Sequence, residues 1–282
     1  METIGLHHVT VATHDIQRFY NFYNKLLGLK LIKESMNIEN DAMKHLYFGD
    51  NNGNAGTLLS VLEVANPFTI EDCSDEIYAY SFRVPTDYSL YVFKQRFDAA
   101  NVKYETVIKI NGKHALPFYD CDGRKVYLIS DELNNGIPLG EPTPDSAVDA
   151  LHQILGLGPV FLKLSNVMLT ASLLTQVLNL SPATRYMLPS FNKEVQVLQS
   201  GLGGNGGEIH MIPYERTEKS KALNIEQVAF TVSREALASF KQKLEEVNIP
   251  HSKISDRKYY ETIFIKDLSG IIFEISTETH FK

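Results

Sequence analysis

Residues 7–15, HHVTVATHD, and residues 226–234, EQVAFTVSR, align with each other without a gap. Both stretches alternate apolar and polar residues, which is typical of a half-buried β-strand. Each is followed by a segment whose apolar residues have helical spacing. The same pattern of a strand followed by a helix therefore occurs at two distant places in the chain. This indicates an internal repeat, from which the fold can be predicted.

The first copy of the repeat is the clearest. After the strand, Asp15 is expected to be the N-cap of a helix, and Gly28 stands just past the end of that helix. The apolar face of the helix consists of Ile16, Phe19, Tyr23 and Leu26. Three strands are expected next, at 29–35, 43–50 and 56–64, with turn-forming residues between them. The unit is therefore predicted to be a βαβββ module.

The same order of elements returns three more times, beginning near residues 77, 159 and 226. The second and fourth copies share an Asp-x-x-Gly turn before the last strand, at 120–123 and 267–270. We therefore predict an α+β fold in which four βαβββ modules form two half-barrels with the helices outside. The expected domains are 1–135, with modules one and two, and 158–282, with modules three and four. A Pro- and Gly-rich linker at 136–157 joins them.

Composition excludes several classes of protein. The 282 residues are 44% hydrophobic and 22% charged, as in an ordinary globular protein. The net charge is -7 and Lys and Arg do not cluster, so nucleic acid and anionic membranes are not expected partners. No apolar stretch reaches the roughly 20 residues of a membrane span and the first residues lack a secretory signal pattern, so we expect a cytoplasmic protein. Cys73 and Cys121 have no metal-site or disulfide spacing, so any metal has to be held by His and oxygen ligands.

The repeat resembles the vicinal oxygen chelate superfamily, which includes glyoxalases, bleomycin-resistance proteins and extradiol ring-cleaving dioxygenases. The resemblance spans the chain, and three strings carry it: GLHHVTVATHDIQRFYNFYNKLLGLKLIKES at 5–35, HLYFGDNNGNAGT at 45–57 and DRKYYETIFIKDLSGIIFEI at 256–275. These strings are similar to the four-module bacterial branch of ring-cleaving, hydroquinone-type dioxygenases. The resemblance implies glyoxalase/dioxygenase-like domains and a divalent metal, Fe(II) or Mn(II), held by two His and one carboxylate.

By this resemblance the first metal ligand is His8 and the carboxylate is Glu274. A carboxylate in the apolar run 270–276 is costly to bury unpaired, so a cation beside it is a reasonable inference from the residues themselves. The second His of the family pattern is missing, because the repeat alignment places Gln227 there. An amide oxygen is a weaker ligand than imidazole, although glyoxalases of the superfamily use a Gln at an equivalent position. Zn(II) and Ni(II) are therefore alternatives, and so is a site that has lost its metal.

Three further residues are candidates for the catalytic site. Arg257 matches the family and is suited to pair with an anionic substrate oxygen. Thr10 shares a strand face with His8, and Tyr260 follows in the same string as Arg257. Where the relatives often have Tyr before the last turn, this chain has Phe264, so a hydroxyl is lost there.

The remaining histidines are not expected to be ligands. On an alternating strand His7 points to the face opposite His8, where it serves packing or hydrogen bonding. The others, His45 among them, show no ligand spacing and are expected to be structural or solvated.

The residues that match the family come only from modules one and four, so these two are inferred to form the functional cup. Modules two and three would form a second cup without metal ligands, with Tyr127 at the place of Glu274. The first hypothesis is a metalloenzyme resembling extradiol-type ring-cleaving dioxygenases, acting on a hydroquinone- or catechol-like compound. The alternatives are a quinone-binding or other small-molecule-binding protein of the bleomycin-resistance type and a glyoxalase-like isomerase. The expected partner is a small aromatic or quinone-like molecule, and a homodimer is left open.

Overall fold

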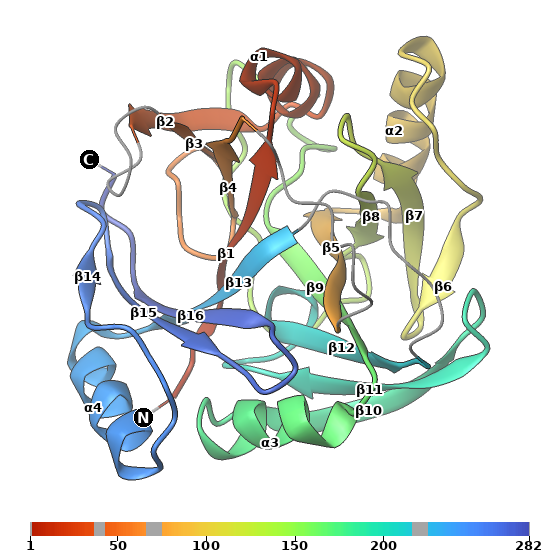
Figure 1. Ribbon diagram of the computed structural model, residues 1–282. Helices are drawn as coiled ribbons and strands as arrows, with labels where there is room; N and C mark the ends of the chain where they lie inside the picture. Colours follow the sequence, from red (N-terminus) through yellow and green to blue (C-terminus); the bar gives the residue numbers. More distant parts are fainter. Residues whose placement is uncertain (1, 37–42, 66–74, 216–224, 282) are drawn as a thin grey trace.

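The computed structural model describes residues 2–36, 43–65, 75–215 and 225–281. Cys73 lies outside this part of the chain, and Cys121 is a free cysteine. The strands form two 8-stranded sheets, each of them curled, with helices around them (Figure 1). The predicted α+β fold of four βαβββ modules in two half-barrels is thereby confirmed.

The first sheet combines modules one and four, in the strand order β14-β15-β16-β13-β1-β4-β3-β2. Module one supplies β1 (Gly5–Thr13), β2 (Lys30–Met36), β3 (Lys44–Gly49) and β4 (Leu58–Glu63). Module four supplies β13 (Ile225–Val232), β14 (Ser255–Asp256), β15 (Glu261–Lys266) and β16 (Ile272–Thr277). Strand β1 pairs antiparallel with β13 and parallel with β4, so the two modules join through β1 and β13.

The second sheet combines modules two and three, in the order β10-β11-β12-β9-β5-β8-β7-β6. Module two supplies β5 (Glu76–Val84), β6 (Ile108–Ile110), β7 (Lys113–Tyr119) and β8 (Lys125–Ser130). Module three supplies β9 (Leu157–Leu164), β10 (Ser181–Leu188), β11 (Lys193–Gln199) and β12 (Glu208–Pro213). The inferred pairing of modules is thus confirmed. The division into 1–135 and 158–282 stays a prediction, and the sheets do not follow it, because each takes one module from either side of the linker.

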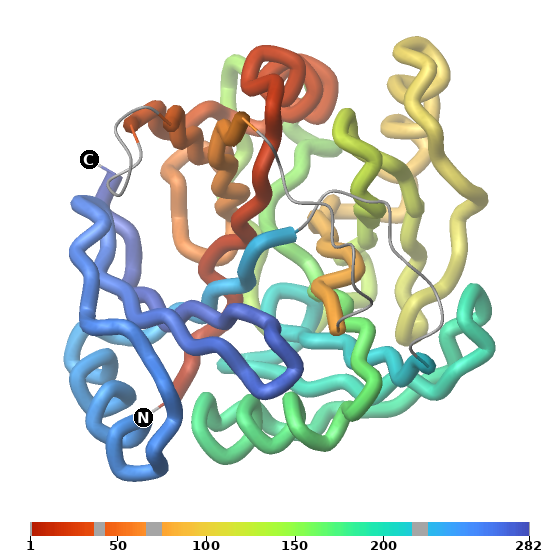
Figure 2. Tube along the Cα trace, viewed as in Figure 1, coloured from red at the N-terminus to blue at the C-terminus, as the bar shows by residue number. Residues whose placement is uncertain are grey.

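Helices lie on the outside of the sheets (Figures 1 and 2). They are α1 (Ile16–Tyr20), which continues as the π-helical η1 (Asn21–Leu26), α2 (Asp87–Ala99), α3 (Val167–Gln176), α4 (Arg234–Glu246) and the short 3-10 helix η2 (Asn205–Gly207). The predicted N-cap is confirmed, because the Asp15 carboxylate accepts a 2.9 Å hydrogen bond from the Arg18 backbone N–H. Gly28 has a φ of 80°, which a glycine adopts without strain at a helix end. Within the described ranges, no helix is long and apolar enough to cross a membrane.

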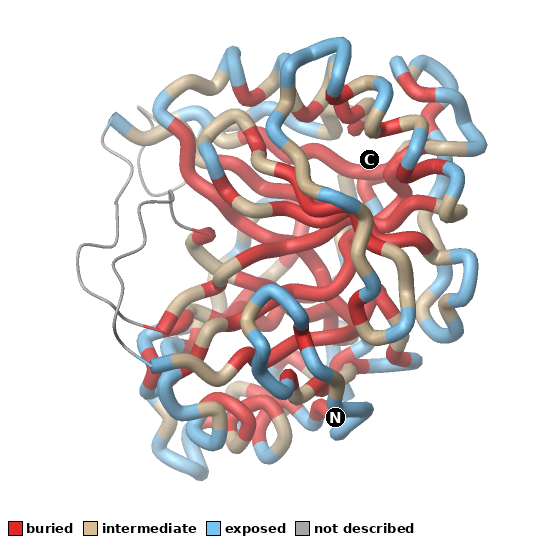
Figure 3. Tube along the Cα trace, turned by 90° about the vertical axis from the view of Figure 1, so that its right-hand side faces the viewer, coloured by how far each residue is buried: buried red, intermediate tan, exposed pale blue. Residues whose placement is uncertain are grey.

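Buried residues run through the centre of the molecule from both sheets (Figure 3). One large apolar cluster includes Val9 and Phe48 of the first sheet and Phe82 and Phe118 of the second. A separate apolar cluster belongs to the second sheet alone, and Tyr127 is buried within it. The position predicted as the counterpart of Glu274 therefore carries a packed side chain, in agreement with a structural role for the second cup.

Arg83 ties the predicted linker to β5. Its side chain is 2% exposed, and its guanidinium donates to Asp131 Oδ1 at 3.1 Å, to the Pro138 carbonyl at 3.1 Å and to the Ile137 carbonyl at 2.6 Å. Arg83→Met is expected to destabilise the fold by about 3–5 kcal/mol, because it leaves the Asp131 carboxylate, whose side chain is 7% exposed, without its charged partner.

Urea unfolding measures this effect, with Arg185→Met as the control. The Arg185 side chain is 64% exposed and pairs with Glu194, so its loss is expected to change the free energy of unfolding by less than about 1 kcal/mol. Equal effects of the two substitutions would contradict the assigned role of Arg83.

Candidate functional site

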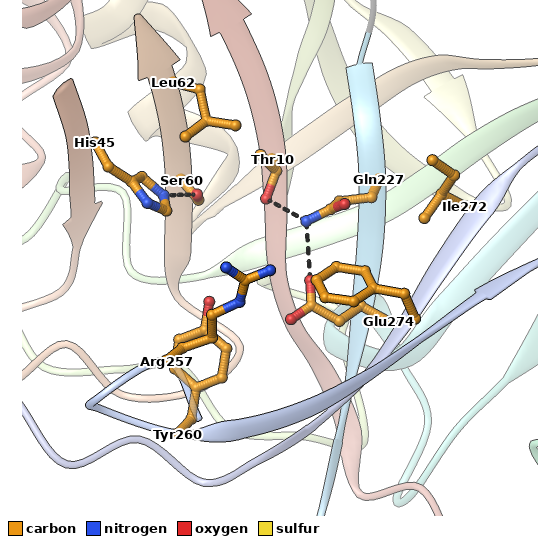
Figure 4. Close-up of a pocket in the computed structure, with 10 residues that line it drawn as sticks. Thr10, His45, Ser60, Leu62, Gln227, Arg257, Tyr260, Ile272 and Glu274 are labelled. Carbon is orange, nitrogen blue, oxygen red and sulfur yellow. Dashed lines mark hydrogen bonds between the residues drawn. The ribbon is translucent and has the colours of Figure 1, made fainter. Parts of the chain in front are cut away.

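The first sheet holds a cavity of about 280 Å³ (Figure 4). Its lining residues are Thr10, His45, Ser60, Leu62, Gln227, Arg257, Tyr260, Phe264, Ile272 and Glu274. All predicted site residues except His8 line this cavity, and His8 contacts Glu274. The structure therefore brings the candidates together from both ends of the sequence.

Strand register explains why these side chains converge. Thr10 on β1 pairs with Ser60 on β4 and with Gln227 on β13, so the three residues form one row across neighbouring strands. Paired residues in a sheet point to the same face. Phe264 on β15 pairs with Glu274 on β16 in the same way, which places its ring beside the carboxylate.

The side chains of His8 and Gln227 both contact the Glu274 carboxylate. His8 Nε2 lies 3.1 Å from Glu274 Oε2, and both residues are 1% exposed. The Gln227 amide donates to Glu274 Oε2 at 2.9 Å and to Thr10 Oγ1 at 3.2 Å. Burial acts to raise the pKa of Glu274, but the charge and hydrogen bond of His8 outweigh it and lower the pKa to about 2. The carboxylate is therefore ionised at neutral pH.

His7 does not turn away from His8, so its predicted orientation is wrong, whereas its predicted role in packing and hydrogen bonding is confirmed. Leu6 pairs with Phe230 and Val9 with Val228, which leaves one extra residue on β1 between these pairs. Such a β-bulge breaks the alternation of side chains along the strand. The Nδ1 atoms of His7 and His8 consequently lie 2.7 Å apart.

The roles of the ring nitrogens follow from their partners. The Thr277 carbonyl can only accept, so His7 Nε2 donates to it across 2.9 Å. Burial and the nearby His8 lower the pKa of His7 to about 3, so the ring is neutral and its Nδ1 accepts from His8 Nδ1. In this structure His8 Nε2–H donates to the ionised Glu274 carboxylate 3.1 Å away, and a cation that displaces this proton would leave the lone pair on Nε2 while Nδ1–H still donates to His7. This is the tautomer in which a histidine binds a metal, oriented by the partner of its other nitrogen.

The donor atoms fit a divalent cation on one condition. In an octahedral site with bonds of about 2.1 Å, adjacent ligand atoms stand roughly 3.0 Å apart. The separations from Glu274 Oε2, 3.1 Å to His8 Nε2 and 2.9 Å to the Gln227 amide, agree with that spacing. In the described part of the chain no three His, Cys, Asp or Glu side chains are grouped to hold a metal, so a cation at His8 and Glu274 would need Gln227 as its third ligand. Turning its amide exchanges nitrogen for oxygen without changing its shape.

Tyr260 and Arg257 also line the cavity. The Tyr260 ring packs against the rings of His7 and His8, with centroids 4.9 Å and 5.5 Å away. Burial raises the pKa of Tyr260, so its hydroxyl stays protonated and can donate. The Arg257 guanidinium lies 5.1 Å from the centre of the Phe264 ring and brings a positive charge to the cavity.

His45 lines the cavity, a position that the sequence-based prediction missed. Its Nε2 lies 2.6 Å from Ser60 Oγ, and its ring packs on Tyr47 with centroids 4.3 Å apart. Burial, aided by His8 and Arg257, lowers the pKa of His45 to about 3, so the imidazole is neutral. Alternation along β3 shows that His45 and Tyr47 share a face, but only the pairing of β3 with β4 shows that this face lines the cavity.

Comparison with known proteins agrees with this architecture. Residues 5–125 match the family described as "Glyoxalase/Bleomycin resistance protein/Dioxygenase superfamily". The chain is 33% identical to the "Putative ring-cleaving dioxygenase MhqA" of Bacillus subtilis (strain 168), over 99% of this chain and 88% of that protein. It is 27% identical to the "Chlorohydroquinone/hydroquinone 1,2-dioxygenase" of Sphingobium indicum, over 98% of this chain and 86% of that protein.

Solved structures extend the likeness. A crystal structure titled as a putative dioxygenase from Bacillus subtilis superposes with a TM-score of 0.80 at 25% identity, covering 98% of this chain and 86% of that one. Glyoxalase I from Zea mays superposes with a TM-score of 0.68 at 14% identity, covering 97% of this chain and 92% of that one. The latter likeness concerns the fold alone.

Proposed function

Because the chain belongs to the glyoxalase/bleomycin resistance protein/dioxygenase superfamily, we propose that it is an extradiol-type, ring-cleaving dioxygenase-like enzyme for hydroquinone- or catechol-like compounds. One observation carries the proposal. The hydrogen-bond chain from the Thr277 carbonyl through His7 to His8 Nδ1 fixes the His8 ring with its Nε2 3.1 Å from the Glu274 carboxylate. The names of the relatives, a ring-cleaving dioxygenase and a hydroquinone dioxygenase, support the substrate class.

In this proposal His8, Gln227 and Glu274 hold a divalent cation. Likeness to the family favours Fe(II) or Mn(II), and the amide ligand keeps Zn(II) and Ni(II) as alternatives. A bound cation would supply Lewis acidity toward a phenolic oxygen of the substrate.

The other residues of the cavity bind and orient the aromatic ring. Arg257 stabilises negative charge on a substrate oxygen, and the protonated Tyr260 hydroxyl is a donor near the same position. Thr10 Oγ1 accepts a hydrogen bond from the Gln227 amide and so helps to hold this side chain beside Glu274. The apolar side chains of Leu62, Phe264 and Ile272 line the cavity and keep water away from the ring.

A specific observation favours a second candidate, the small-molecule-binding protein. The Gln227 amide donates hydrogen bonds to both Glu274 and Thr10, so the buried polar groups of Gln227 and Glu274 have partners without a cation. A glyoxalase-like isomerase remains the alternative within the enzymes. The cytoplasm as location and a homodimer as assembly stay predictions from the sequence.

Metal analysis and oxygen consumption test the proposal together. The purified protein is analysed for metal before and after adding Fe(II), Mn(II), Zn(II) and Ni(II). Oxygen uptake is then measured with substituted hydroquinones and catechols. We expect one Fe(II) or Mn(II) per chain and substrate-dependent uptake. No stoichiometric metal under any condition supports the binding protein, and tight Zn(II) or Ni(II) without uptake supports the isomerase.

His7→Phe is expected to weaken Mn(II) binding by about 10- to 100-fold, because it removes the group that fixes the tautomer and orientation of His8. The ring still packs in the same place, and thermal unfolding checks that the fold is kept. Titration with Mn(II) measures the dissociation constant. His114→Phe, on β7 of the second sheet, is the control, and equal changes in both variants would contradict the role of His7.

A further inference from the structure

The cavity has a second polar corner that the proposed metal ligands do not use. His45 on β3 and Ser60 on β4 lie there, joined by a hydrogen bond of 2.6 Å. Gln227 and Glu274 lie at the other side, on β13 and β16 (Figure 4). Arg257 reaches into the space between them (Figure 4).

Strand register sets the span between the two corners. Ser60, Thr10 and Gln227 occupy one row across the adjacent strands β4, β1 and β13. Neighbouring strands are about 4.8 Å apart, so the backbones of Ser60 and Gln227 are roughly 10 Å apart. A single aromatic ring with hydroxyls at opposite ends can therefore contact the His45 and Ser60 corner and the Gln227 and Glu274 corner at once. A ring whose two hydroxyls are neighbours can place its hydroxyls at only one of these corners.

Hydrogen bonds hold His45 in place. Tyr47 Oη lies 3.4 Å from His45 Nδ1 and 3.4 Å from Tyr260 Oη, and the imidazole packs on the Tyr47 ring. Together with Ser60, these groups form a chain of polar atoms that ends at the cavity. A neutral imidazole and a serine hydroxyl can exchange hydrogen bonds with an uncharged phenolic hydroxyl.

We propose that His45 and Ser60 form a subsite for the remote hydroxyl of a 1,4-dihydroxybenzene, and that this contact makes hydroquinone bind more tightly than a phenol that lacks the para hydroxyl. The inference rests on the proposed function for the class of substrate. His45 is here a specificity-determining residue that contacts the substrate at the end opposite the metal ligands.

Calorimetric titration in the absence of oxygen tests this subsite without turnover. Protein supplemented with Mn(II) is titrated with hydroquinone, catechol and phenol. We expect hydroquinone to bind about tenfold more tightly than phenol, as one additional hydrogen bond provides. In His45→Phe, which keeps a ring but removes both nitrogens, hydroquinone affinity falls to the level of phenol. Phenol and catechol stay within about twofold of their wild-type affinities.

Two further variants guard against a general loss of structure. Ser60→Ala is expected to weaken hydroquinone binding about threefold, and His45→Gln to retain part of the preference, since its amide still hydrogen-bonds. The matched control is His114→Phe, because this histidine is 37% exposed on the second sheet and its replacement leaves all three affinities unchanged.

Equal wild-type affinity for hydroquinone and phenol would overturn the subsite, and so would an equal loss of all three ligands in His45→Phe. These outcomes are separate from the test of the proposed function. Oxygen uptake by the wild type supports the enzyme even if His45→Phe binds hydroquinone normally. A loss confined to hydroquinone supports the subsite even if no oxygen is consumed.

Discussion

Gln227→His is expected to tighten Fe(II) binding by about 10- to 100-fold, because an imidazole replaces a weak amide ligand. At present the Gln227 amide donates to Glu274 and Thr10, so a cation has to displace two hydrogen bonds before the oxygen can bind. A histidine at this position presents a lone pair to the cation instead.

Anaerobic competition against a coloured iron chelator measures the change. Gln196→His, on β11 of the second sheet, controls for the gain of a histidine as such. Unchanged Fe(II) affinity in Gln227→His would mean that the side chain at 227 does not reach the cation. The alignment of 7–15 with 226–234 would then describe the fold but not the site.

Glu274→Gln is expected to weaken metal binding by at least about 100-fold and to abolish oxygen uptake with hydroquinones. It removes the negative charge of the proposed ligand set, a larger loss than that of an orienting partner such as His7. The change keeps the shape of the side chain. The Ser276 hydroxyl, which donates to Glu274 Oε1 at 3.0 Å, can donate to the amide oxygen of the new glutamine instead.

The chain supplies a matched control for this variant. Glu208 lies 2.8 Å from His210 on β12, so the second sheet also has a buried pair of carboxylate and imidazole. Glu208→Gln removes the same charge from a comparable pair and is expected to leave metal content unchanged. Metal analysis of both purified variants shows whether the loss of metal is specific to Glu274→Gln. Retention of stoichiometric metal in Glu274→Gln would show that the cation, if bound, is held elsewhere.

Most of the fold could be predicted because a repeat constrains every copy at once. The gapless match between 7–15 and 226–234 predicts two equivalent strands, and β1 and β13 are indeed paired with each other. The Asp15 cap and Gly28 mark one helix correctly because both act through local backbone geometry. The sequence contains no comparable local signal for the way that modules from different halves share a sheet, and that pairing had to be inferred from the motif residues.

The site could be predicted only in part. His8 and Glu274 stand in recognisable strings, and the structure places them 3.1 Å apart. The position of His7 was missed because a bulge depends on the partner strand, whereas alternation assumes a regular one. His45 was missed because its neighbour Ser60 lies on another strand, and a sequence pattern within β3 carries no information about that contact.

Strand β1 lies between β4 and β13, and this arrangement has a consequence for biosynthesis. The strand that carries His8 is made well before β13, so the edge that pairs with β13 stays open until residues 225–232 have left the ribosome. At about 5–20 residues per second that delay is on the order of ten seconds or more. The second sheet comes from consecutive modules and can close earlier. A chain interrupted before β13 would expose β1 as an open, aggregation-prone edge.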